Sequence, residues 1–264
     1  MPDYDGRVIY SCSDAHGVID VVDEPTVRSL HFGTQARQST MFFHDRHALA
    51  LVYTRCMMTC LLFADQPRSV LLLGLGGGSL AKFLRRHFPH CRIDVIEKRQ
   101  KVVELARTHF CLVEDPLLQI HHTDAADFLA APCADSYDLV LVDIHDPDGM
   151  SSAVGAESFF AACRQRLHRR GILSINLWSG EREEVLVKVR HNLEDRFARQ
   201  VLYLPVARKR NCIGLAFNYE LPPGLIKALR RRAAELGPRF GIEFPALLRA
   251  LQKANPRQLG RRFF

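Results

Sequence analysis

Uninterrupted apolar runs alternate with helical stretches from Arg68 onward, and this alternation is the clearest pattern in the chain. Strands without polar alternation are buried on both faces, and helices between such strands indicate a parallel sheet. We therefore expect an α/β fold with a doubly wound, mostly parallel sheet. The predicted strands are 69-SVLLLG-74, 92-RIDVIE-97, 118-LQIHH-122, 137-YDLVLVD-143 and 171-GILSINL-177.

The first part of the chain follows a different pattern, in which apolar and polar residues alternate with a period of two. Residues 7–12, 18–22 and 26–33 show this alternation and are separated by short polar segments, one of which ends in a glycine. Strands exposed on one face have this period. The pattern predicts a small antiparallel β element ahead of the α/β region.

Two further apolar segments have predictable places in the fold. The segment 48–64 carries Arg55 near its middle and is shorter than the roughly 20 residues that span a bilayer. We expect it to form a buried helix and expect no membrane association. Residues 199–207 and 212–218 read as adjacent strands and predict an antiparallel hairpin that closes one edge of the sheet.

The net charge of +7 comes from the end of the chain. Residues 220–264 hold ten Lys or Arg and three Glu, whereas basic and acidic residues balance in residues 1–219. The proline pair Pro222-Pro223 marks the expected start of this basic helical tail. Such a tail can bind nucleic acid or an acidic partner. The basic residues could instead form the solvated face of a helix, and we favour this explanation. Binding of nucleic acid by the tail remains an open alternative.

The sequence also bears on compartment and metal content. The N-terminal sequence MPDYDGRV lacks the basic run and apolar segment of a secretory signal, and the cysteines form no C-x-x-C pair. We expect a cytoplasmic protein without disulfides. Histidine pairs such as His121-His122 have no carboxylate or cysteine at ligand spacing, so we expect no metal.

A glycine-rich turn is the first candidate for chemistry. In 70-VLLLGLGGGSLAKFL-84, Gly74, Gly76 and Gly78 stand between an apolar strand and a predicted helix. Missing side chains let the backbone approach a ligand, and the helix N-terminus offers unpaired N–H groups, although a tight connection alone would also use glycine. Glu97 ends the next strand, where a carboxylate can accept both hydroxyls of a ribose. We therefore expect a ligand that contains a nucleoside, and both NAD and S-adenosylmethionine remain candidates.

Carboxylates also follow the third and fourth predicted strands. Asp124, next to Ala125, can accept the amino group of an adenine, and Asp143 ends an apolar strand. A carboxylate at such a position costs desolvation unless it has a partner or a task. Ligands of open α/β sheets bind at the carboxyl ends of the strands, so Glu97, Asp124 and Asp143 are expected along one crevice. Asp146 follows in the loop after this strand, where the preference of aspartate for turns would by itself explain its presence.

As a set, these residues resemble the spermidine synthases, or polyamine aminopropyltransferases, and point to a divergent bacterial member. The resemblance covers roughly residues 28–177. Its carriers are 35-QARQST-40, Tyr53, the turn GLGGGS, Glu97, Asp124-Ala125 and 143-DIHDP-147, which matches the family's D-x-x-D-P. The resemblance implies a class I AdoMet-methyltransferase-like Rossmann fold, a homodimer, and decarboxylated S-adenosylmethionine as the co-substrate.

The activity that the resemblance implies is transfer of an aminopropyl group to a diamine, a small-molecule amine substrate. A protonated diamine cannot attack until a carboxylate accepts a proton from it, and Asp143 would take this role. Asp146 would hold the second ammonium, while Gln38 and Tyr53 would touch the nucleoside or substrate. Alternatively, Tyr53 could be a helix residue that packs in the core and does not touch the ligand. The co-substrate would be bound by Gly74, Gly76, Gly78, Glu97, Asp124 and Ala125.

Three departures from the family pattern keep other functions open. Gly77 stands where family members carry an Asp that helps to hold the aminopropyl ammonium. Thr54 and Arg55 replace a His and a Glu after the tyrosine, and Lys98 replaces a second acid after Glu97. Lost acids and an added arginine suit a ligand that keeps its carboxylate. The alternatives are an S-adenosylmethionine-dependent methyltransferase with an unknown acceptor and a non-catalytic nucleoside-binding homologue.

These observations divide the chain into three parts. We expect an N-terminal β element over residues 1–45, a nucleoside-binding α/β domain over residues 46–219, and the basic helical tail over residues 220–264.

Overall fold

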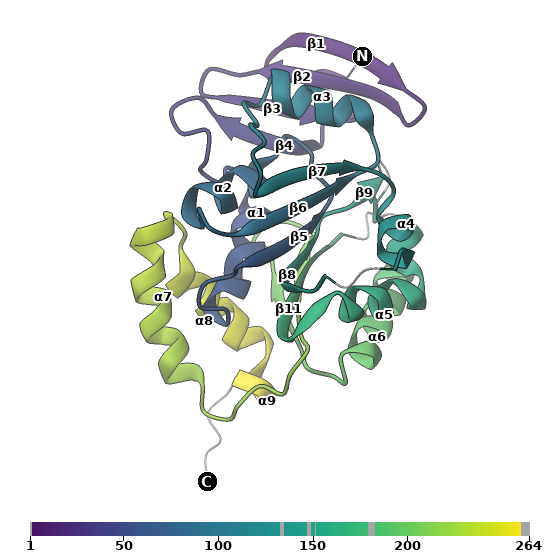
Figure 1. Cartoon of the computed structure of the whole chain (residues 1–264). Helices are drawn as coiled ribbons and strands as arrows, with labels where there is room; N and C mark the ends of the chain where they lie inside the picture. Colours follow the sequence, from purple (N-terminus) through teal and green to yellow (C-terminus); the bar gives the residue numbers. More distant parts are fainter. Residues whose placement is uncertain (1, 133–134, 147–148, 151, 179–182, 260–264) are drawn as a thin grey trace.

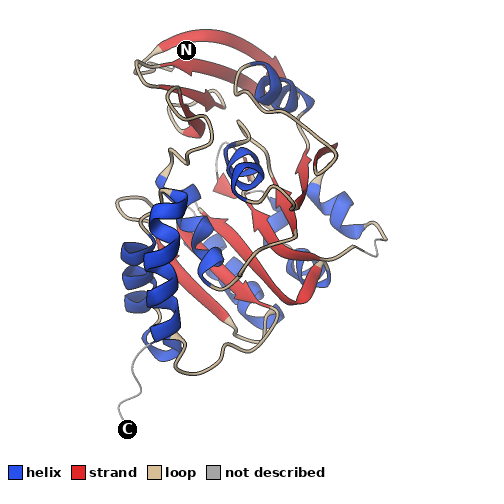
Figure 2. Cartoon of the chain, turned by 60° about the vertical axis from the view of Figure 1, so that its left-hand side comes forward, coloured by secondary structure: helices blue, strands red, loops and turns tan. Residues whose placement is uncertain are grey.

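A seven-stranded sheet runs through the middle of the molecule, and a separate four-stranded sheet lies over one end of it (Figure 1). The structure is a computed structural model that describes residues 2–132, 135–146, 149–150, 152–178 and 183–259. The four-stranded sheet and the last described helix, α9 (Pro256–Leu259), lie at opposite ends of the molecule (Figures 1 and 2).

The central sheet is mostly parallel. In sheet order, its strands are β12 (Val201–Pro205), β13 (Cys212–Phe217), β11 (Leu167–Leu177), β8 (Tyr137–Val142), β5 (Ser69–Leu73), β6 (Arg92–Glu97) and β7 (Leu118–His122). From β11 to β7 each neighbouring pair is parallel, and β13 runs antiparallel to both β11 and β12. The doubly wound sheet expected from the sequence is confirmed, and so is the hairpin at its edge.

Side chains of the central strands point alternately to the two faces of the sheet, and helices cover both faces. Val70 and Leu72 of β5 belong to one core cluster, whereas Leu71 and Leu73 belong to the other. Full burial of such a side chain stabilises the fold by about 1.5–3 kcal/mol, which explains why residues 70–73 of this strand are all apolar. The first face packs against α1 (Val52–Met57), α2 (Ser79–His87), α7 (Ile226–Phe240) and α8 (Phe244–Ala254), and the second against α4 (Ala125–Ala130), α5 (Glu157–Gln165) and α6 (Glu183–Arg196).

The N-terminal sheet is antiparallel, which confirms the small β element expected from the sequence. Its strands, in order, are β1 (Arg7–Asp14), β2 (Gly17–Asp23), β3 (Val27–His31) and β4 (Arg37–Phe42). The pattern analysis missed β4 because two of its three buried residues, Ser39 and Thr40, are polar. Ile19 and Leu30 of this sheet pack with Val102 of α3 (Gln100–Thr108), which joins the two sheets.

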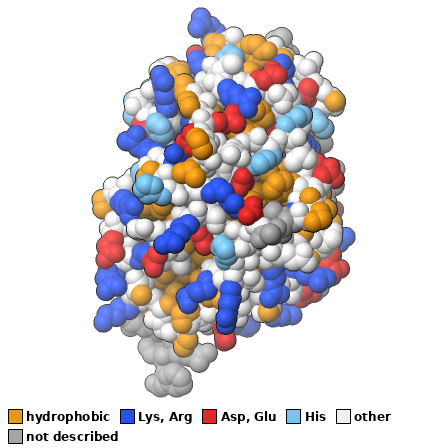
Figure 3. Space-filling model, viewed as in Figure 1, with side chains coloured by type: hydrophobic (Ala, Val, Ile, Leu, Met, Phe, Trp, Pro, Cys, Tyr) orange, Lys and Arg blue, Asp and Glu red, His pale blue; other side chains and the backbone are white. Residues whose placement is uncertain are grey.

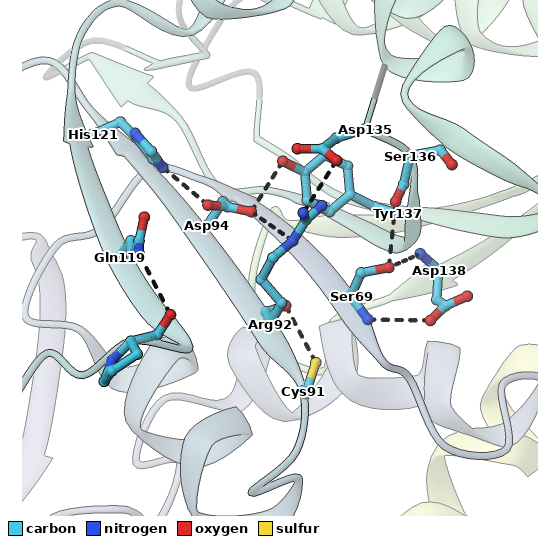
Figure 4. Close-up of polar contacts among 11 residues, drawn as sticks. Ser69, Cys91, Arg92, Asp94, Gln119, His121, Asp135, Ser136, Tyr137 and Asp138 are labelled. Carbon is cyan, nitrogen blue, oxygen red and sulfur yellow. Dashed lines mark hydrogen bonds and ion pairs between the residues drawn. The ribbon is translucent and has the colours of Figure 1, made fainter. Parts of the chain in front are cut away.

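A polar cluster links β6, β7 and β8 within the central sheet (Figure 4). Asp94, which is 8% exposed, accepts a hydrogen bond of 3.1 Å from the hydroxyl of Tyr137. Its carboxylate oxygens also lie 3.0 Å from Nε2 of His121 and 3.3 Å from Nε of Arg92. Burying a carboxylate is costly unless it is hydrogen-bonded and paired. These partners meet that cost and tie β6 to its neighbour β7 and, across β5, to β8.

The apolar segment 48–64 is buried, but the expectation of one continuous α-helix is wrong. Only α1 is α-helical, and a 3-10 helix, η1 (Met58–Leu62), follows it directly. At the change, the carbonyl of Met57 accepts a hydrogen bond of 3.0 Å from the hydroxyl of Ser174 in β11. The end of α1 is thereby anchored to the central sheet.

The basic C-terminal segment is helical, as expected, and continues after α8 with α9 (Pro256–Leu259). Leu229, Leu236 and Phe244 on its helices belong to the core cluster of the first sheet face. Lys227 and Arg231 are exposed on the outside of α7. The helices are therefore amphipathic, with the apolar side in the core. Across the described ranges, no helix is both long and apolar enough to cross a membrane.

Three short elements lie between β8 and α5. They are β9 (His145–Asp146), β10 (Gly149–Met150) and the 3-10 helix η2 (Ser152–Gly155).

Candidate active site

The largest group of sequence-predicted site residues meets where the strand order of the central sheet reverses. The chain enters the sheet at β5, winds outward to β7 and returns to β8 on the other side of β5. The connections after β5 and β8 lead to helices on opposite faces of the sheet, and a crevice forms at such a switch point. A pocket there holds about 920 Å³ of empty space, part of it open to solvent. Of the predicted site residues, its wall includes Gln38, Tyr53, Gly74, Gly76, Glu97, Asp124, Ala125 and Asp143.

The glycine turn brings the loops after β5 and β8 into close contact. Gly74 has φ +95°, and a Cβ there would lie 2.3 Å from the carbonyl oxygen of Asp143. A side chain would therefore push the two loops apart. Gly78 has φ +71° and begins α2, but its missing Cβ faces Leu112, 3.1 Å from Cδ1. Gly74 and Gly76 line the pocket, whereas Gly78 belongs to the turn but not to the pocket wall.

The space beside Gly77 is filled. A Cβ at this position would lie 2.8 Å from Cδ1 of Phe110 and 2.9 Å from Oγ of Ser39. The Oγ of Ser39 lies 3.1 Å from Oγ of Ser79, and both serines belong to the pocket wall. An acid at position 77 would displace the Phe110 ring or the serine. The chain thus has a pair of hydroxyls where the resembling family places a carboxylate.

Glu97 ties the end of β6 to the glycine turn. Its Oε2 accepts a hydrogen bond of 3.0 Å from the backbone N–H of Leu75, and its Oε1 accepts one of 2.9 Å from that of Arg99. Burial raises the pKa of Glu97, although these two hydrogen bonds act in the opposite direction. A carboxylate has about four lone-pair sites, so two remain for the hydroxyls of a ribose.

Asp124 has a structural task besides its place in the pocket wall. Its Oδ1 accepts a hydrogen bond of 2.7 Å from the backbone N–H of Ala126, which caps the N-terminus of α4. Such a cap is worth about 1 kcal/mol. Ala125 follows it directly and is 9% exposed. The sequence pattern identified the position of Asp124 but not its role as a helix cap.

Asp143 is held by two neutral side chains, the half-buried Tyr53 and the buried Asn176. Its Oδ2 accepts a hydrogen bond of 3.0 Å from the hydroxyl of Tyr53, and its Oδ1 accepts one of 2.9 Å from Nδ2 of Asn176. Asn176, which is 4% exposed, in turn accepts a hydrogen bond of 2.9 Å from Nδ2 of Asn211 at its Oδ1. This chain of amides fixes the orientation of the Asp143 carboxylate.

The sequence analysis missed Asn176 and Asn211. A signal for Asn176 was present, because it is an amide near the end of the otherwise apolar strand 171-GILSINL-177. A buried amide inside a strand needs hydrogen-bond partners, and the strand ends beside the loop after Asp143. Asn211 had no such signal, since it lies in the polar turn of the hairpin.

Tyr53 combines both roles that the sequence left open. It packs against the main core cluster and its hydroxyl reaches the pocket, 3.0 Å from Asp143 and 3.3 Å from the carbonyl oxygen of Gln38. Burial, followed by the nearby charge of Asp143, raises the pKa of Tyr53 well above its usual value. The phenol therefore stays protonated and donates a hydrogen bond.

Arg55 does not face the pocket, which contradicts the hypothesis that it meets the ligand. Its Nε lies 3.2 and 3.1 Å from the carboxylate oxygens of Glu243, and its Nη1 donates to the carbonyls of Leu49 and Ala50, both at 2.9 Å. Thr54 and Lys98, two further residues that depart from the family pattern, do line the pocket. The positive charge of Arg55 is thus used to join α1 to α8.

The N-terminal sheet closes one side of the pocket. Phe32, Gln38 and Ser39 from this part of the chain belong to the pocket wall. The guanidinium of Arg99 lies 4.4 Å from the ring centroid of Phe32 and pairs with Asp14 at 2.9 Å. Arg99 is 4% exposed, so this pairing joins the sheet firmly to the loop after Glu97.

The remaining predicted residue is Asp146. Its backbone lies in β9, which pairs with β10, and its side chain lies outside the described part of the structure. Among the residues that the structure describes, no group of three or more His, Cys, Asp or Glu side chains is arranged to hold a metal ion.

The fold and the pocket together define an α/β protein with a crevice at the switch point of its sheet. The family model of the spermine/spermidine synthase domain matches residues 50–208, and the chain belongs to this family. It is 34% identical to a polyamine aminopropyltransferase of Chromobacterium violaceum over 255 residues, which are 96% of this chain and 97% of that protein. The protein is accordingly a transferase.

Solved structures show the same fold. A probable spermidine synthase from Corynebacterium glutamicum superposes with a TM-score of 0.73 at 18% identity, over 86% of this chain and 87% of that chain. A spermidine synthase in complex with the transition state analogue AdoDATO superposes with a TM-score of 0.71 at 20% identity, over 96% and 88% of the respective chains.

Proposed function

We propose that the protein transfers an aminopropyl group from decarboxylated S-adenosylmethionine to a diamine. The observation that carries this proposal is the Asp143 carboxylate, held by Tyr53 and Asn176 in the same pocket as Glu97 and Asp124. The relatives named polyamine aminopropyltransferase support the same reaction.

In this proposal the nucleoside lies along the ends of β6 and β7. Glu97 accepts the ribose hydroxyls, and Asp124 with Ala125 contacts the adenine. Gly74 and Gly76 give the sulfonium room beside the backbone. The three carboxylates of the pocket wall outnumber its two cationic residues, Lys98 and Arg99, and this favours a positively charged ligand. Gln38 and Tyr53 line the side toward the N-terminal sheet.

Asp143 would orient the attacking amine and accept its proton. The nitrogen lone pair forms a bond to the aminopropyl carbon next to sulfur, the carbon–sulfur bond breaks, and its electron pair stays on sulfur. The products are the aminopropylated amine and neutral methylthioadenosine, and the proton passes through Asp143 to solvent. Positioning supplies much of the catalysis, because the leaving group departs neutral. By the family resemblance, Asp146 would bind the distant ammonium of the diamine.

The co-substrate is proposed to be the decarboxylated form. The sequence argument for intact S-adenosylmethionine relied partly on Arg55, and this arginine pairs with Glu243 outside the pocket. The hydroxyls of Ser39 and Ser79 would hydrogen-bond the aminopropyl ammonium in place of an acid at position 77. A homodimer and a cytoplasmic location remain proposals that come from the family resemblance and the sequence.

The nucleoside product tests this proposal. The protein is incubated with a diamine such as putrescine and either decarboxylated or intact S-adenosylmethionine, and the nucleosides are separated by liquid chromatography. We expect methylthioadenosine from the decarboxylated donor only. Formation of S-adenosylhomocysteine from the intact donor would instead establish methyl transfer, and no product at high enzyme concentration would exclude both.

A further inference from the structure

A second pocket lies between the end of α2, the loop before α1 and the turn between α7 and α8. It holds about 1020 Å³ of empty space, part of it open to solvent. The proposed transfer reaction uses none of its wall, although α1 and α2 contribute to both pockets. Lys, Arg and His side chains gather over this side of the molecule, at the left where α2 lies above α7 (Figures 1 and 3).

Three arginines line this pocket, and one of them, Arg55, pairs with Glu243. Arg86 at the end of α2 and Arg239 at the end of α7 both belong to its wall. Within the described ranges, neither forms an ion pair with a carboxylate. Both positive charges act on the imidazole of His87, so both guanidinium groups lie near the same ring.

The two carboxylates of the pocket wall are already occupied. Glu243 pairs with Arg55 through both of its oxygens. Asp45 accepts hydrogen bonds of 3.0 and 3.3 Å from the backbone N–H groups of His47 and Ala48. Asp45 keeps its negative charge, which interacts with the positive charge of Arg86. The three arginines of the wall still outnumber its two carboxylates by one, so the pocket has a net positive charge.

Neutral donors and an apolar surface complete the pocket. Burial, followed by the charge of Arg86, lowers the pKa of both His47 and His87, so each imidazole is neutral at pH 7 and offers one N–H group. Phe42 and Leu49 form an apolar part of the wall together with Phe240, whose ring lies edge-on to His87 at 4.9 Å. The site therefore has a cationic part and an apolar part.

We propose that this second pocket binds a small organic phosphate. The phosphate group would lie between Arg86 and Arg239, because guanidinium groups bind phosphate oxygens through strong, charge-assisted hydrogen bonds. The organic part would pack against Phe42, Leu49 and Phe240. The proposal is independent of the reaction in the catalytic pocket.

Titration calorimetry with phenyl phosphate and with inorganic phosphate tests the site on the whole protein. Phenyl phosphate is expected to bind more tightly, because its ring adds apolar contact. The double variant Arg86→Gln/Arg239→Gln should weaken phenyl phosphate binding by roughly tenfold or more, as losing two charge-assisted contacts implies. Both arginines are exposed, so the variant should fold normally, which its unfolding midpoint checks.

The matched control is Arg231→Gln/Arg249→Gln, which removes the same charge from exposed positions of α7 and α8 outside the pocket. Binding to this variant should stay within about twofold of the wild type, since long-range charge effects are screened by salt. The proposal is overturned if the wild type does not bind phenyl phosphate, or if the control weakens binding as much as the pocket variant. Equal affinity for phenyl phosphate and inorganic phosphate would overturn the organic part of the proposal.

Discussion

Asp143 and Asp94 are two enclosed carboxylates that each accept a hydrogen bond from a tyrosine, Tyr53 in one case and Tyr137 in the other. Asp94 also faces Arg92 and His121 within the sheet, and it has no place in the wall of the catalytic pocket. Asp143 lines that pocket at the carboxyl end of its strand. A paired carboxylate inside the sheet serves the fold, whereas one beside free space can serve chemistry. The comparison therefore supports a role in stability for Asp94 and the proton transfer that is proposed for Asp143.

Replacing Asp143 by Asn should have the largest effect. The amide keeps the shape of the side chain but cannot accept the proton of the amine, so kcat should fall by roughly 10²–10⁴-fold, the usual contribution of a general base. Steady-state release of methylthioadenosine measures kcat, and calorimetric titration with methylthioadenosine should show nearly unchanged affinity. A variant that retained wild-type kcat would remove Asp143 from the mechanism.

Replacing Asp94 by Asn should have the opposite result, with a loss of stability and little change in kcat. The change removes the charge that faces His121 and one of the two carboxylates that face Arg92, the other being Asp135. It should lower the free energy of unfolding by about 1–3 kcal/mol. Urea unfolding followed by circular dichroism measures this loss. The folded variant should keep kcat within about threefold of the wild type, since less than 1 kcal/mol of transition-state energy is at stake. If kcat fell as far as in the Asp143 variant, the two carboxylates would not differ in task.

Replacing Asn176 by Ala sharpens the role of the amide that holds Asp143. Loss of one charge-assisted hydrogen bond should lower kcat by roughly tenfold, because the carboxylate is no longer fixed. Ser174→Ala is the matched control, since this serine is equally buried in β11 but donates to the carbonyl of Met57. The control should lose stability and keep kcat. Equal losses of kcat in both variants would show a general effect of the strand.

The smallest effect is expected for the contribution of Glu97 to the pH dependence of stability. Burial raises its pKa above the usual 4.5, so the folded protein holds this proton more tightly than the unfolded chain. The resulting stability is present below pH 4.5 and is lost as the pH rises through the folded pKa. The free energy of unfolding of the wild type, relative to Glu97→Gln, should therefore decrease on raising the pH from 4.5 to neutrality. An increase over this range, measured by urea unfolding at each pH, would contradict the shift.

Much of the fold, and the presence of three carboxylates in one pocket, can be predicted from local sequence. Uninterrupted apolar runs specify buried parallel strands, and the residues at strand ends gather at one edge of the sheet. This reasoning alone brings Glu97, Asp124 and Asp143 to one pocket, as the structure has them. Strand β4 was missed because its buried positions 39 and 40 carry hydroxyls and interrupt the apolar pattern.

The remaining features depend on contacts between distant parts of the chain. Arg55 faces Glu243, which is 188 residues away, and no local pattern shows that its charge is used there. Phe110 fills the space beside Gly77, so the missing acid is matched by a distant ring. Asn211 reaches Asp143 only through Asn176. Such partners are fixed by packing, not by spacing in the sequence.

The amine product tests the central claim most directly. The protein is incubated with putrescine and decarboxylated S-adenosylmethionine that carries an isotopic label in its aminopropyl group, and the amines are analysed by mass spectrometry. The proposed reaction predicts putrescine extended by one labelled aminopropyl group, in an amount equal to the methylthioadenosine released. A label that stays with the nucleoside, or a methylated amine, would contradict aminopropyl transfer.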